Sequence, residues 1–557
     1  MKKVITILLL GFTLVCHGQS SSDVHRKYMY SLDNQMDNIN GLSFGMMQLS
    51  LLQNNRLRSF SSENTFFSTS SLEQNTTSSV IRNEVNKNAA TVGFDNWAGY
   101  TVQGNFTSKK YNPHSFGISA SVNAIDRQNK LEGSEIQNRS AGFLVNGDYS
   151  YNKNKIYVKS NLEIDKDKRN YDVVSRPSKL HIDNNYGSWS NFMRYQISAN
   201  SKLETRASLI GYGGSIGADS FRYEGRQSLA TLGTSWKQMM NNVTLTNGVT
   251  FQTLLANNLF SRRQNRWEYS NVITPGIKNA KVGATIKNAI IYTDSTSFFY
   301  APSLALTYSY GNKSSVQLLA NRFLRTQTNS LERWPYYSYS DEGIQNITGE
   351  QLQGYNTIWL KKDFRLIQML RYQRFSDFSI AGNSLASMAR ASVGVDRRTG
   401  SYQKWNYSGI YHYRFAGEGE LAKLAPLHTV VANVSKRQIK AKLINKLAKS
   451  NCHWDGNIST GYRSRAATLF LGEVTGQRMR NLFFTDVSYT LTNRRYNNGS
   501  GYYGYNGRDV WFFTIEAQNI FNAQALTSTQ QESTALLLTE GIRTARQIKV
   551  GLTYMFR

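Results

Sequence analysis

Cysteine, proline and long apolar runs are scarce in this sequence. Only 2 of its 557 residues are cysteine, and only 6 are proline. Two cysteines are too few for a disulfide-rich secreted scaffold, and scarce proline leaves long segments able to pair within a sheet. After residue 15, no segment reaches the roughly 18 consecutive apolar residues that suggest a membrane-spanning helix. These absences exclude a disulfide-stapled domain and a bundle of transmembrane helices.

Acidic residues are also few, with 37 against 65 basic residues and a formal net charge of +28. Charged residues make up 18% of the chain and aromatic residues 12%, including 33 Tyr and 27 Phe. An ordinary soluble domain is about a quarter charged, and a disordered chain would be poorer in aromatic residues. The abundant Tyr, Phe, Thr, Asn, Ser and Gly indicate strands and turns. The positive charge is typical of a nucleic-acid binder or of a protein that contacts an anionic membrane surface.

The first residues decide between these two partners. A basic start at residues 1–3 precedes the apolar run VITILLLGFTLV at 4–15, which is the pattern of a signal peptide and too short to span a bilayer. Small residues at the flanking positions predict cleavage between Gly18 and Gln19. Lipidation of Cys16 is the alternative, although the bulky residue before this cysteine argues against it. Export argues against nucleic acid as the partner of this positive charge and favours an anionic membrane surface.

Apolar and polar residues alternate in many later segments. In residues 116–124, Phe, Ile, Val and Ala take every second position, with Gly, Ser and Asn between them. A period of two gives a strand one apolar face and one polar face. The same pattern recurs at 156–165, 243–252, 281–290 and 511–518.

These segments have the length of membrane-crossing strands, which need about 9 to 11 residues when tilted. At an assumed ~24 residues per strand and connection, the chain holds about 22 strands, an even number as in large outer-membrane barrels. The predicted fold is all-β, a large antiparallel transmembrane β-barrel. A soluble sandwich or propeller is the alternative, but it needs turn signals every ~8 to 12 residues. The predicted parts are a signal peptide at 1–18, a lumenal or periplasmic segment at 19–90 and the barrel at 91–557.

Short and long connections between the strands predict which end of the barrel faces which side. The short ones contain Asn or Gly, which tolerate turn conformations, and we expect them to be periplasmic. They lie at 151–154, 240–242, 310–313 and 398–401. Extracellular loops are expected to be longer, and the candidates lie at 165–187, 253–279, 322–354, 494–507 and 522–542. The Lys- and Leu-rich segment 418–450 fits either a strand pair or a short helix.

The carboxyl end carries the most specific pattern. Residues 547–557 read QIKVGLTYMFR, in which Tyr554 and Phe556 have the place of the aromatic signal that the barrel-assembly machinery recognises. Together with EAQNIFN at 516–522, this end resembles the end of the barrel of TonB-dependent receptors. The resemblance implies a 22-stranded importer of iron chelates, cobalamin or glycans, closed by an amino-terminal plug and coupled to a TonB system.

The amino-terminal part departs from this family. Residues 20–32 contain no TonB box, and residues 33–90 lack the glycine and arginine pattern of a plug. We therefore expect a receptor-type barrel without a full plug, in which energy-coupled import is in doubt.

Two sets of residues are candidates for ligand binding. Tyrosines in the predicted extracellular loop at 494–507 could stack on sugars or planar chelates, and an aromatic girdle at the membrane rim is the alternative. These are Tyr496, Tyr502, Tyr503 and Tyr505. Basic residues on the predicted lumenal face favour anionic solutes, and the alternative is cross-strand pairing with Glu163, Asp165 and Glu516. These are Lys159, Lys281, Lys287 and Lys549.

The residues that could bind a metal or catalyse a reaction form no recognisable set. The seven histidines, including His412, His428 and His453, show no metal-binding spacing, and no spacing singles out a Ser/His/Asp set. We therefore expect no metal, no cofactor and no enzymatic activity. The leading hypothesis is a transporter or receptor-like barrel that passes a solute through a polar lumen. A scaffold barrel with little transport and an outer-membrane hydrolase are the alternatives.

The signal peptide and the barrel pattern together predict a location in the outer membrane of a Gram-negative bacterium, and the expected partners follow from this location. They are the lipid and lipopolysaccharide of the outer membrane, the barrel-assembly machinery, and a surface lipoprotein or a TonB system.

Overall fold

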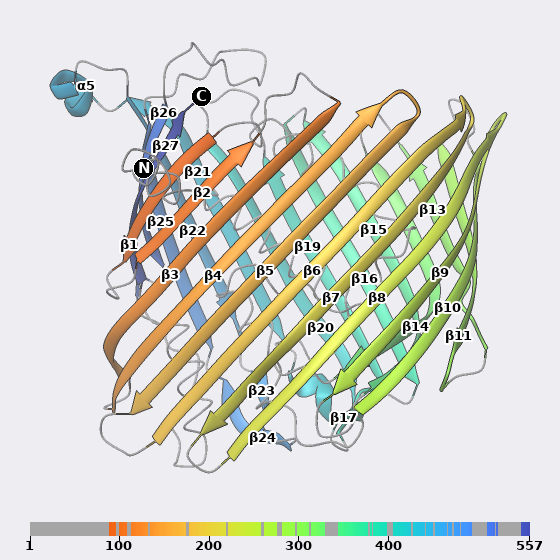
Figure 1. The fold of residues 1–557 in the computed structure, drawn as a ribbon, viewed down its shortest axis with the longest axis horizontal. Coiled ribbons are helices and arrows are strands. Elements are labelled where there is room, and N and C mark those ends of the chain that lie inside the picture. The colour runs from red at the N-terminus through yellow and green to blue at the C-terminus, as the bar shows by residue number, and fades with distance from the viewer. Residues whose placement is uncertain are drawn as a thin grey trace, which may run out of the picture.

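The computed structural model describes most residues between 88 and 556 (Figure 1). The gaps in the described part are 96–99, 108–112, 132–133, 174–177, 219–220, 258–260, 276–280, 296–297, 311–313, 329–343, 362, 377–378, 381–382, 398–404, 425–426, 441, 449–451, 465, 471–472, 480, 493–509, 519 and 522–546. The predicted signal peptide, and the predicted amino-terminal segment up to residue 87, lie outside the described residues.

Nearly all described residues form long antiparallel strands. The first half of the sheet consists of β1 (Asn88–Asp95), β2 (Tyr100–Thr107), β3 (His114–Leu131), β4 (Ser134–Lys153), β5 (Ile156–Val173), β6 (Ser178–Ser198), β7 (Ser201–Ala218), β8 (Phe221–Met240), β9 (Val243–Asn257), β10 (Ser261–Pro275) and β11 (Val282–Thr293). The second half consists of β12 (Phe299–Tyr300), β13 (Ser303–Ser309), β14 (Ser315–Thr328), β15 (Ile344–Lys361), β16 (Phe364–Ser376), β19 (Ser387–Arg397), β20 (Trp405–Glu418), β21 (His428–Lys440), β22 (His453–Arg463), β25 (Leu482–Thr492), β26 (Val510–Gln518) and β27 (Gln547–Phe556).

A few short elements complete the described part of the chain. Two small hairpins, β17 (Ser379–Ile380) with β18 (Asn383–Ser384) and β23 (Ala466–Phe470) with β24 (Glu473–Met479), lie outside the main sheet. The helices are a 3-10 turn, η2 (Glu420–Leu424), and one α-helix, α5 (Lys442–Ala448). Among the described residues, no helix is long and apolar enough to cross a membrane.

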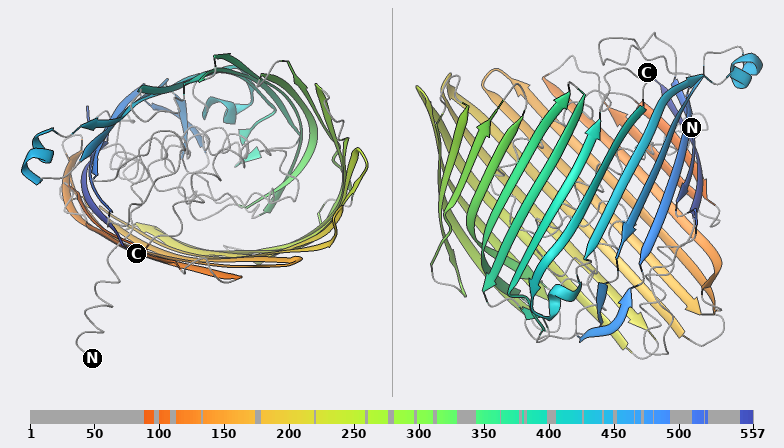
Figure 2. Two further views of the ribbon diagram at one scale, coloured as in Figure 1. Left: turned by 90° about the horizontal axis from the view of Figure 1, so that it is seen from above. Right: turned by 180° about the vertical axis from the view of Figure 1, so that it is seen from behind.

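The main sheet closes on itself. It has 23 strands, and apart from the two-residue β12 each pairs with the strands that precede and follow it in this sheet. β1 also pairs with β27, from Asn88 opposite Phe556 to Asp95 opposite Lys549. Counting the two-residue β12 with β13, with which it shares the partner β11, the ring has 22 strands. Seen from above, along its axis, the sheet forms a closed ring (Figure 2). The predicted fold, a large antiparallel barrel of about 22 strands, is confirmed.

The alternating sequence pattern explains the two faces of this wall. Apolar residues that alternate along each strand are exposed on one face, as in β3, where Phe116, Ile118 and Val122 are exposed. These side chains stay exposed because the described part of the chain forms no second layer over this face. The face with the exposed Leu, Ile, Phe, Trp and Tyr side chains is the outer face, and the polar face lines the lumen.

The two ends of the barrel differ in their connections. Two-residue turns at 154–155, 199–200 and 241–242 share one end with the start of β1 and the end of β27, which we name the turn end. It is uppermost in Figure 1. Asn154 and Asn241 have positive φ angles of 54° and 46°, so asparagine supplies the left-handed conformation that tight hairpins require. At the opposite end, the loop end, β14 leads into β15 and β26 into β27.

Two predicted long loops are wrong. Residues 165–187 belong almost entirely to β5 and β6, and residues 253–279 contain the whole of β10. Strands β3 to β8 have 18 to 21 residues instead of the predicted 9 to 11. A 21-residue strand is about 70 Å long, so at a tilt of about 40° it rises about 50 Å, twice the ~25 Å apolar band of such barrels. These polar segments are therefore parts of strands that extend the wall beyond the membrane band, and they are not loops.

Other connection predictions have mixed outcomes. The short turns at 151–154 and 240–242 are confirmed. The segment 418–450 contains the end of β20, η2, β21 and α5, so it is both strand and helix. Residues 494–507 and 522–542 lie outside the described residues. The strands on either side of 494–507, β25 and β26, meet this segment at the turn end, so it cannot be extracellular if the short turns are periplasmic.

Candidate functional site

The candidate site is the inner face of the barrel wall, which carries polar and charged side chains. In β10, the exposed outer residues Trp267 and Tyr269 alternate with the buried Arg266, Glu268 and Ser270. In β16, the exposed Leu370 and Tyr372 alternate with the buried Arg371 and Gln373. A polar inner face that is largely buried needs hydrogen bonds and ion pairs among its own side chains.

An ion triad is buried on the inner face of β10 and β11. Arg266 donates from Nη2 to Glu268 Oε2 at 2.9 Å, and Lys287 Nζ donates to Glu268 Oε1 at 3.0 Å. Arg266 also donates from Nη1 to the backbone carbonyl of Leu324 at 3.0 Å. The carboxylate of Glu268 thus lies between two cations, and Arg266 also connects this triad to β14.

Polar contacts near the triad join strands that are not neighbours in the sheet. Gln264 Nε2 donates to Asn346 Oδ1 at 3.0 Å and to Ser295 Oγ at 2.8 Å. Asn346 Nδ2 donates to Thr293 Oγ1 at 3.0 Å. Because Asn346 is in β15 and Gln264 is in β10, the loop-end part of β14 and β15 packs against the inner face of β10 and β11.

An amide ladder continues along β15 and β16. Gln373 Nε2 donates to Gln351 Oε1 at 2.8 Å, and Gln351 Nε2 donates to Gln353 Oε1 at 3.0 Å. Arg371 Nη2 donates to the same Gln353 oxygen at 3.0 Å. These contacts fix the side chains of this part of the inner face through neighbours on two strands.

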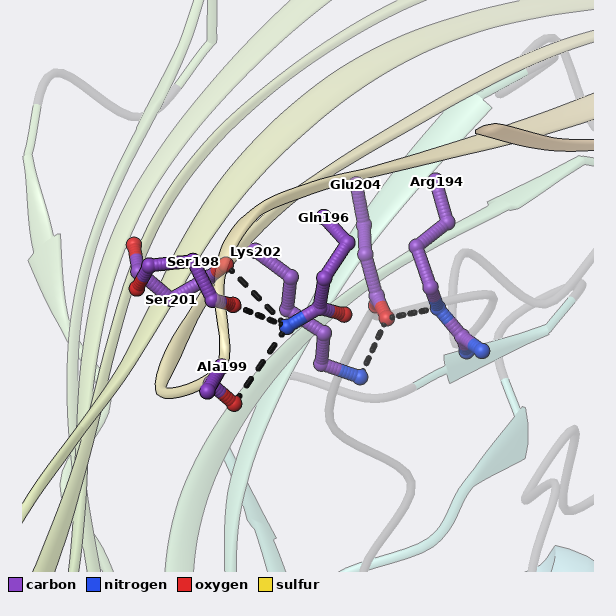
Figure 3. A network of polar contacts seen from close by, with 7 residues as sticks. All are labelled: Arg194, Gln196, Ser198, Ala199, Ser201, Lys202 and Glu204. Atoms are coloured by element: carbon purple, nitrogen blue, oxygen red, sulfur yellow. Dashed lines mark hydrogen bonds and ion pairs between the residues drawn. The ribbon is translucent and has the colours of Figure 1, made fainter. Parts of the chain in front are cut away.

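A second charged group lies on the inner face of β6, β7 and β8 at the turn end (Figure 3). Glu204 accepts from Arg194 Nε at 2.9 Å and from Lys202 Nζ at 2.6 Å. Lys237 is opposite Lys202 in the register of β7 and β8. Arg206 lies with its guanidinium carbon 5.2 Å from the ring centroid of Phe192. We call Arg194, Lys202, Arg206 and Lys237 the basic cluster; it surrounds the single carboxylate of Glu204.

The turn beside this cluster is held by one amide. Gln196 Nε2 donates to the backbone carbonyls of Ser198 at 2.5 Å, Ser201 at 3.3 Å and Ala199 at 3.4 Å, as Figure 3 shows. The Gln196 side chain therefore fixes the tight hairpin from which Arg194 and Lys202 extend toward Glu204. The basic cluster is anchored by backbone structure and keeps a net positive charge.

The predicted lumenal lysines occupy different surroundings. Lys159 is exposed on the inner face of β5, opposite Phe192 in the register of β5 and β6. Lys281 is exposed directly before β11. Lys287 is partly buried and pairs with Glu268, which the sequence pattern did not single out. Lys549 is opposite Glu516 in the backbone register of β26 and β27.

The predicted aromatic residues fall into two groups. Tyr496, Tyr502, Tyr503 and Tyr505 lie outside the described residues. Tyr554 is exposed on the outer face of β27, and Phe556 is the last residue of that strand and lies opposite Asn88 of β1. The carboxyl-terminal strand therefore forms the seam that closes the barrel.

The three histidines named from the sequence do not converge. His412 is buried on the inner face of β20 and its Nδ1 lies 2.5 Å from the hydroxyl oxygen of Ser392. His428 stacks on Tyr413 of the outer face, and His453 begins β22 at the other end of the barrel. Within the described part of the chain, no group of three or more His, Cys, Asp or Glu residues could hold a metal ion.

The geometry defines a class of fold. A closed 22-stranded antiparallel wall, with an apolar outer face and a charged inner face, is the barrel fold of TonB-dependent outer-membrane receptors, and solved structures of such receptors superpose on it. This likeness confirms the resemblance that the carboxyl-terminal residues indicated. No protein-family model matches the chain, and no curated protein matches it either.

Three solved structures illustrate the likeness. The FrpB iron transporter from Neisseria meningitidis (F3-3 variant) has a TM-score of 0.60 at 8% identity, over 84% of this chain and 81% of that chain. The outer membrane transporter YddB from Escherichia coli has a TM-score of 0.58 at 10% identity, over 85% and 81%. The siderophore receptor PirA from Pseudomonas aeruginosa has a TM-score of 0.53 at 10% identity, over 85% and 80%. At these identities the likeness shows the fold.

Proposed function

We propose that this chain is an outer-membrane transporter or receptor-like protein of a Gram-negative bacterium, exported after cleavage between Gly18 and Gln19, that passes a solute through its lumen. The observation that carries the proposal is the closed wall with exposed apolar side chains outside and charged side chains inside. Such a wall is stable only where lipid covers its outer face. The structural neighbours that are named as transporters and receptors support the same function.

The inner wall favours an anionic solute. The basic cluster contributes four cations around the single carboxylate of Glu204, and the exposed Lys159 lies on the neighbouring strand. Cations that line a pore attract anions and repel other cations. Neighbours named for iron and siderophores are compatible with a chelate that carries negative charge.

We propose transport rather than a reaction, without a bound cofactor. The Ser392 and His412 side chains are within hydrogen-bonding distance, as in a nucleophile–base pair, but both are almost fully buried in the wall. A substrate could not reach the hydroxyl without displacing the strand. The proposed partners are outer-membrane lipid and lipopolysaccharide, the barrel-assembly machinery, and either a TonB system or a surface lipoprotein.

Single-channel recording tests this function. The purified chain is inserted into a planar bilayer, and its anion-to-cation permeability ratio is measured from the reversal potential in a salt gradient. We expect an anion preference that falls when Lys159, Arg206 and Lys237 are replaced by Gln. Replacement of Lys423, which pairs with Glu420 on η2, is the matched control and leaves the ratio unchanged.

If the inserted chain does not conduct, a second sample identifies the reason. The same recording is made on a chain that lacks residues 19–87. It distinguishes a lumen closed by that segment from a lumen filled by the side chains of the wall. Conductance only after the deletion supports a gated transporter, whereas silence in both samples favours the scaffold hypothesis. A chain recovered as a soluble protein from the periplasm, without heat-modifiable migration, would contradict the membrane location.

A further inference from the structure

The only α-helix among the described residues, α5, lies outside the barrel at the turn end. Figure 1 shows it beside the ends of β26 and β27, and the view along the axis in Figure 2 places it outside the ring. Its sequence is KLINKLA, and it follows β21. A helix in this position faces whatever surrounds the wall rather than the lumen.

One side of α5 packs on the outer face of the wall. Ile444 contacts a cluster that contains the buried Cys452 and Leu491, together with Trp454 and Phe513. Trp454, Leu491 and Phe513 are cross-strand neighbours on β22, β25 and β26. Leu491 is 6% exposed, whereas Tyr489, which faces the same side of the strand, is 43% exposed. The helix and Cys452 therefore cover a patch of the outer face.

The other side of α5 is apolar and uncovered. Leu443 is 71% exposed and Leu447 is 76% exposed. Residues four apart lie on one side of a helix, so the two leucines form a continuous apolar edge. Lys442 and Lys446 are also four apart, and both are exposed. The helix thus presents an apolar edge beside a basic edge, which is the arrangement of helices that lie in the plane of a membrane surface.

The neighbouring outer face marks the level of the membrane boundary. Trp454 and Trp511 lie in the patch that α5 contacts, and Trp405 on β20 lies with its ring 4.8 Å from Lys436 Nζ. Trp at the rim of the wall is typical of the interface between acyl chains and headgroups. The exposed leucines of α5 are continuous with this lipid-facing surface.

We propose that α5 is an interfacial lipid-binding helix. Leu443 and Leu447 enter the acyl boundary of the leaflet at the turn end, and Lys442 and Lys446 bind the phosphates of anionic phospholipids. The inference rests on the proposed function, because it requires the outer face to lie in a membrane. Charge complementarity and continuity with the lipid-facing wall favour lipid over a protein partner.

Depth-dependent fluorescence quenching tests the proposal on the full chain. Leu443→Cys or Leu447→Cys is labelled with an environment-sensitive fluorophore after folding, when the buried Cys452 does not react, and the barrel is reconstituted in vesicles with nitroxide-labelled lipids. Leu232→Cys, on the exposed outer face of β8, is the embedded control. Asn200→Cys, in the two-residue turn between β6 and β7 at the same end, is the water-exposed control.

The controls separate this inference from the proposed function. We expect lipid to quench the labels at 232, 443 and 447 but not the label at 200. If the label at 232 is not quenched, the barrel is not embedded and the proposed function fails. If the label at 232 is quenched while those at 443 and 447 behave like the label at 200, the proposal for α5 is overturned.

The lysines are tested with headgroups of different charge. A lysine near an anionic surface favours anionic lipid about fivefold, so nitroxide phosphatidylglycerol should quench the label at 447 more than nitroxide phosphatidylcholine does. The Lys442→Gln/Lys446→Gln variant should abolish this preference and keep the quenching by both lipids. Equal quenching by the two lipids in the parent chain would overturn the role of the lysines.

Discussion

Replacement of Glu268 by Gln should strongly destabilise the barrel, because this carboxylate lies between two cations on the inner wall. The Glu268 and Arg266 side chains are each 8% exposed, and that of Lys287 is 19% exposed. The variant keeps the size of the side chain and removes its charge. Two cations then remain close together in a site with little water, without the carboxylate between them.

The structure sets the expected magnitude. Loss of one partner of a buried ion pair costs about 3 to 5 kcal/mol, and the partial exposure of Lys287 places the estimate near the lower value. Glu204→Gln is the matched control, because this carboxylate also accepts from two cations, but Arg194 is 43% and Lys202 25% exposed. Its loss should cost about 1 kcal/mol or less. The difference of about 2 kcal/mol corresponds to a ratio of about 30 in the folding equilibrium.

Urea unfolding in lipid vesicles measures this difference. The folded fraction is followed by heat-modifiable migration and by Trp fluorescence, and the free energy of unfolding is extrapolated to water. The Glu268→Gln/Lys287→Met variant removes one of the two cations and should recover part of the loss, as a double-mutant cycle would show. The reasoning is refuted if Glu268→Gln unfolds within 0.5 kcal/mol of the parent chain, on the order of the error of additivity, or if Glu204→Gln costs as much.

Three further predictions concern the wall itself. A Cβ added at Gly349 would overlap the carbonyl of Arg374 and the ring of Phe323, whereas a Cβ added at Gly187 meets nothing within 4 Å. Gly349→Ala should therefore lower the free energy of unfolding by about 1 to 3 kcal/mol, and Gly187→Ala should change the urea midpoint little. Asn241 has φ 46°, so Asn241→Val should cost about 1 to 2 kcal/mol and Asn241→Gly almost nothing in the same assay. Leu232→Arg on the outer face should cost about 2 to 4 kcal/mol in bilayers, while Thr231→Arg, one residue away on the inner face, should cost far less; equal costs would contradict the assignment of faces.

The sequence predicted the barrel because its strongest signals are local. A period of two along one strand already separates the lipid face from the lumen face, and the strand from Gln547 to Phe556 shows this pattern most clearly. The length of the strands was not predictable in the same way. Residues 165–173 and 178–187 are mostly polar and lack a continuous apolar face, which is typical of a loop. Only their backbone pairing between β5 and β6 shows that they are strand.

The candidate site was predictable only in part. The alternating pattern placed Lys287 on the lumenal face, as predicted. Its partner Glu268 lies in β10, and the polar inner residues of this strand led to the wrong prediction of a loop at 253–279. The basic cluster depends on the register between β6, β7 and β8, which sets Lys202 opposite Lys237. Register is a property of strand pairs, so it could not be derived from one strand alone.

The seam between β1 and β27 has a consequence for the order of folding. Its two strands lie at opposite ends of the sheet-forming chain, so this pairing has the largest sequence separation of any in the ring. Contacts between distant segments form late, because the ends of a long chain must first be brought together. Until residues 547–556 are in place, β26 and β1 are open edges with unpaired backbone groups, which invite pairing with other chains. The last ten residues of the barrel therefore act as its closing step, and a chain shortened by this strand alone should aggregate rather than form a smaller barrel.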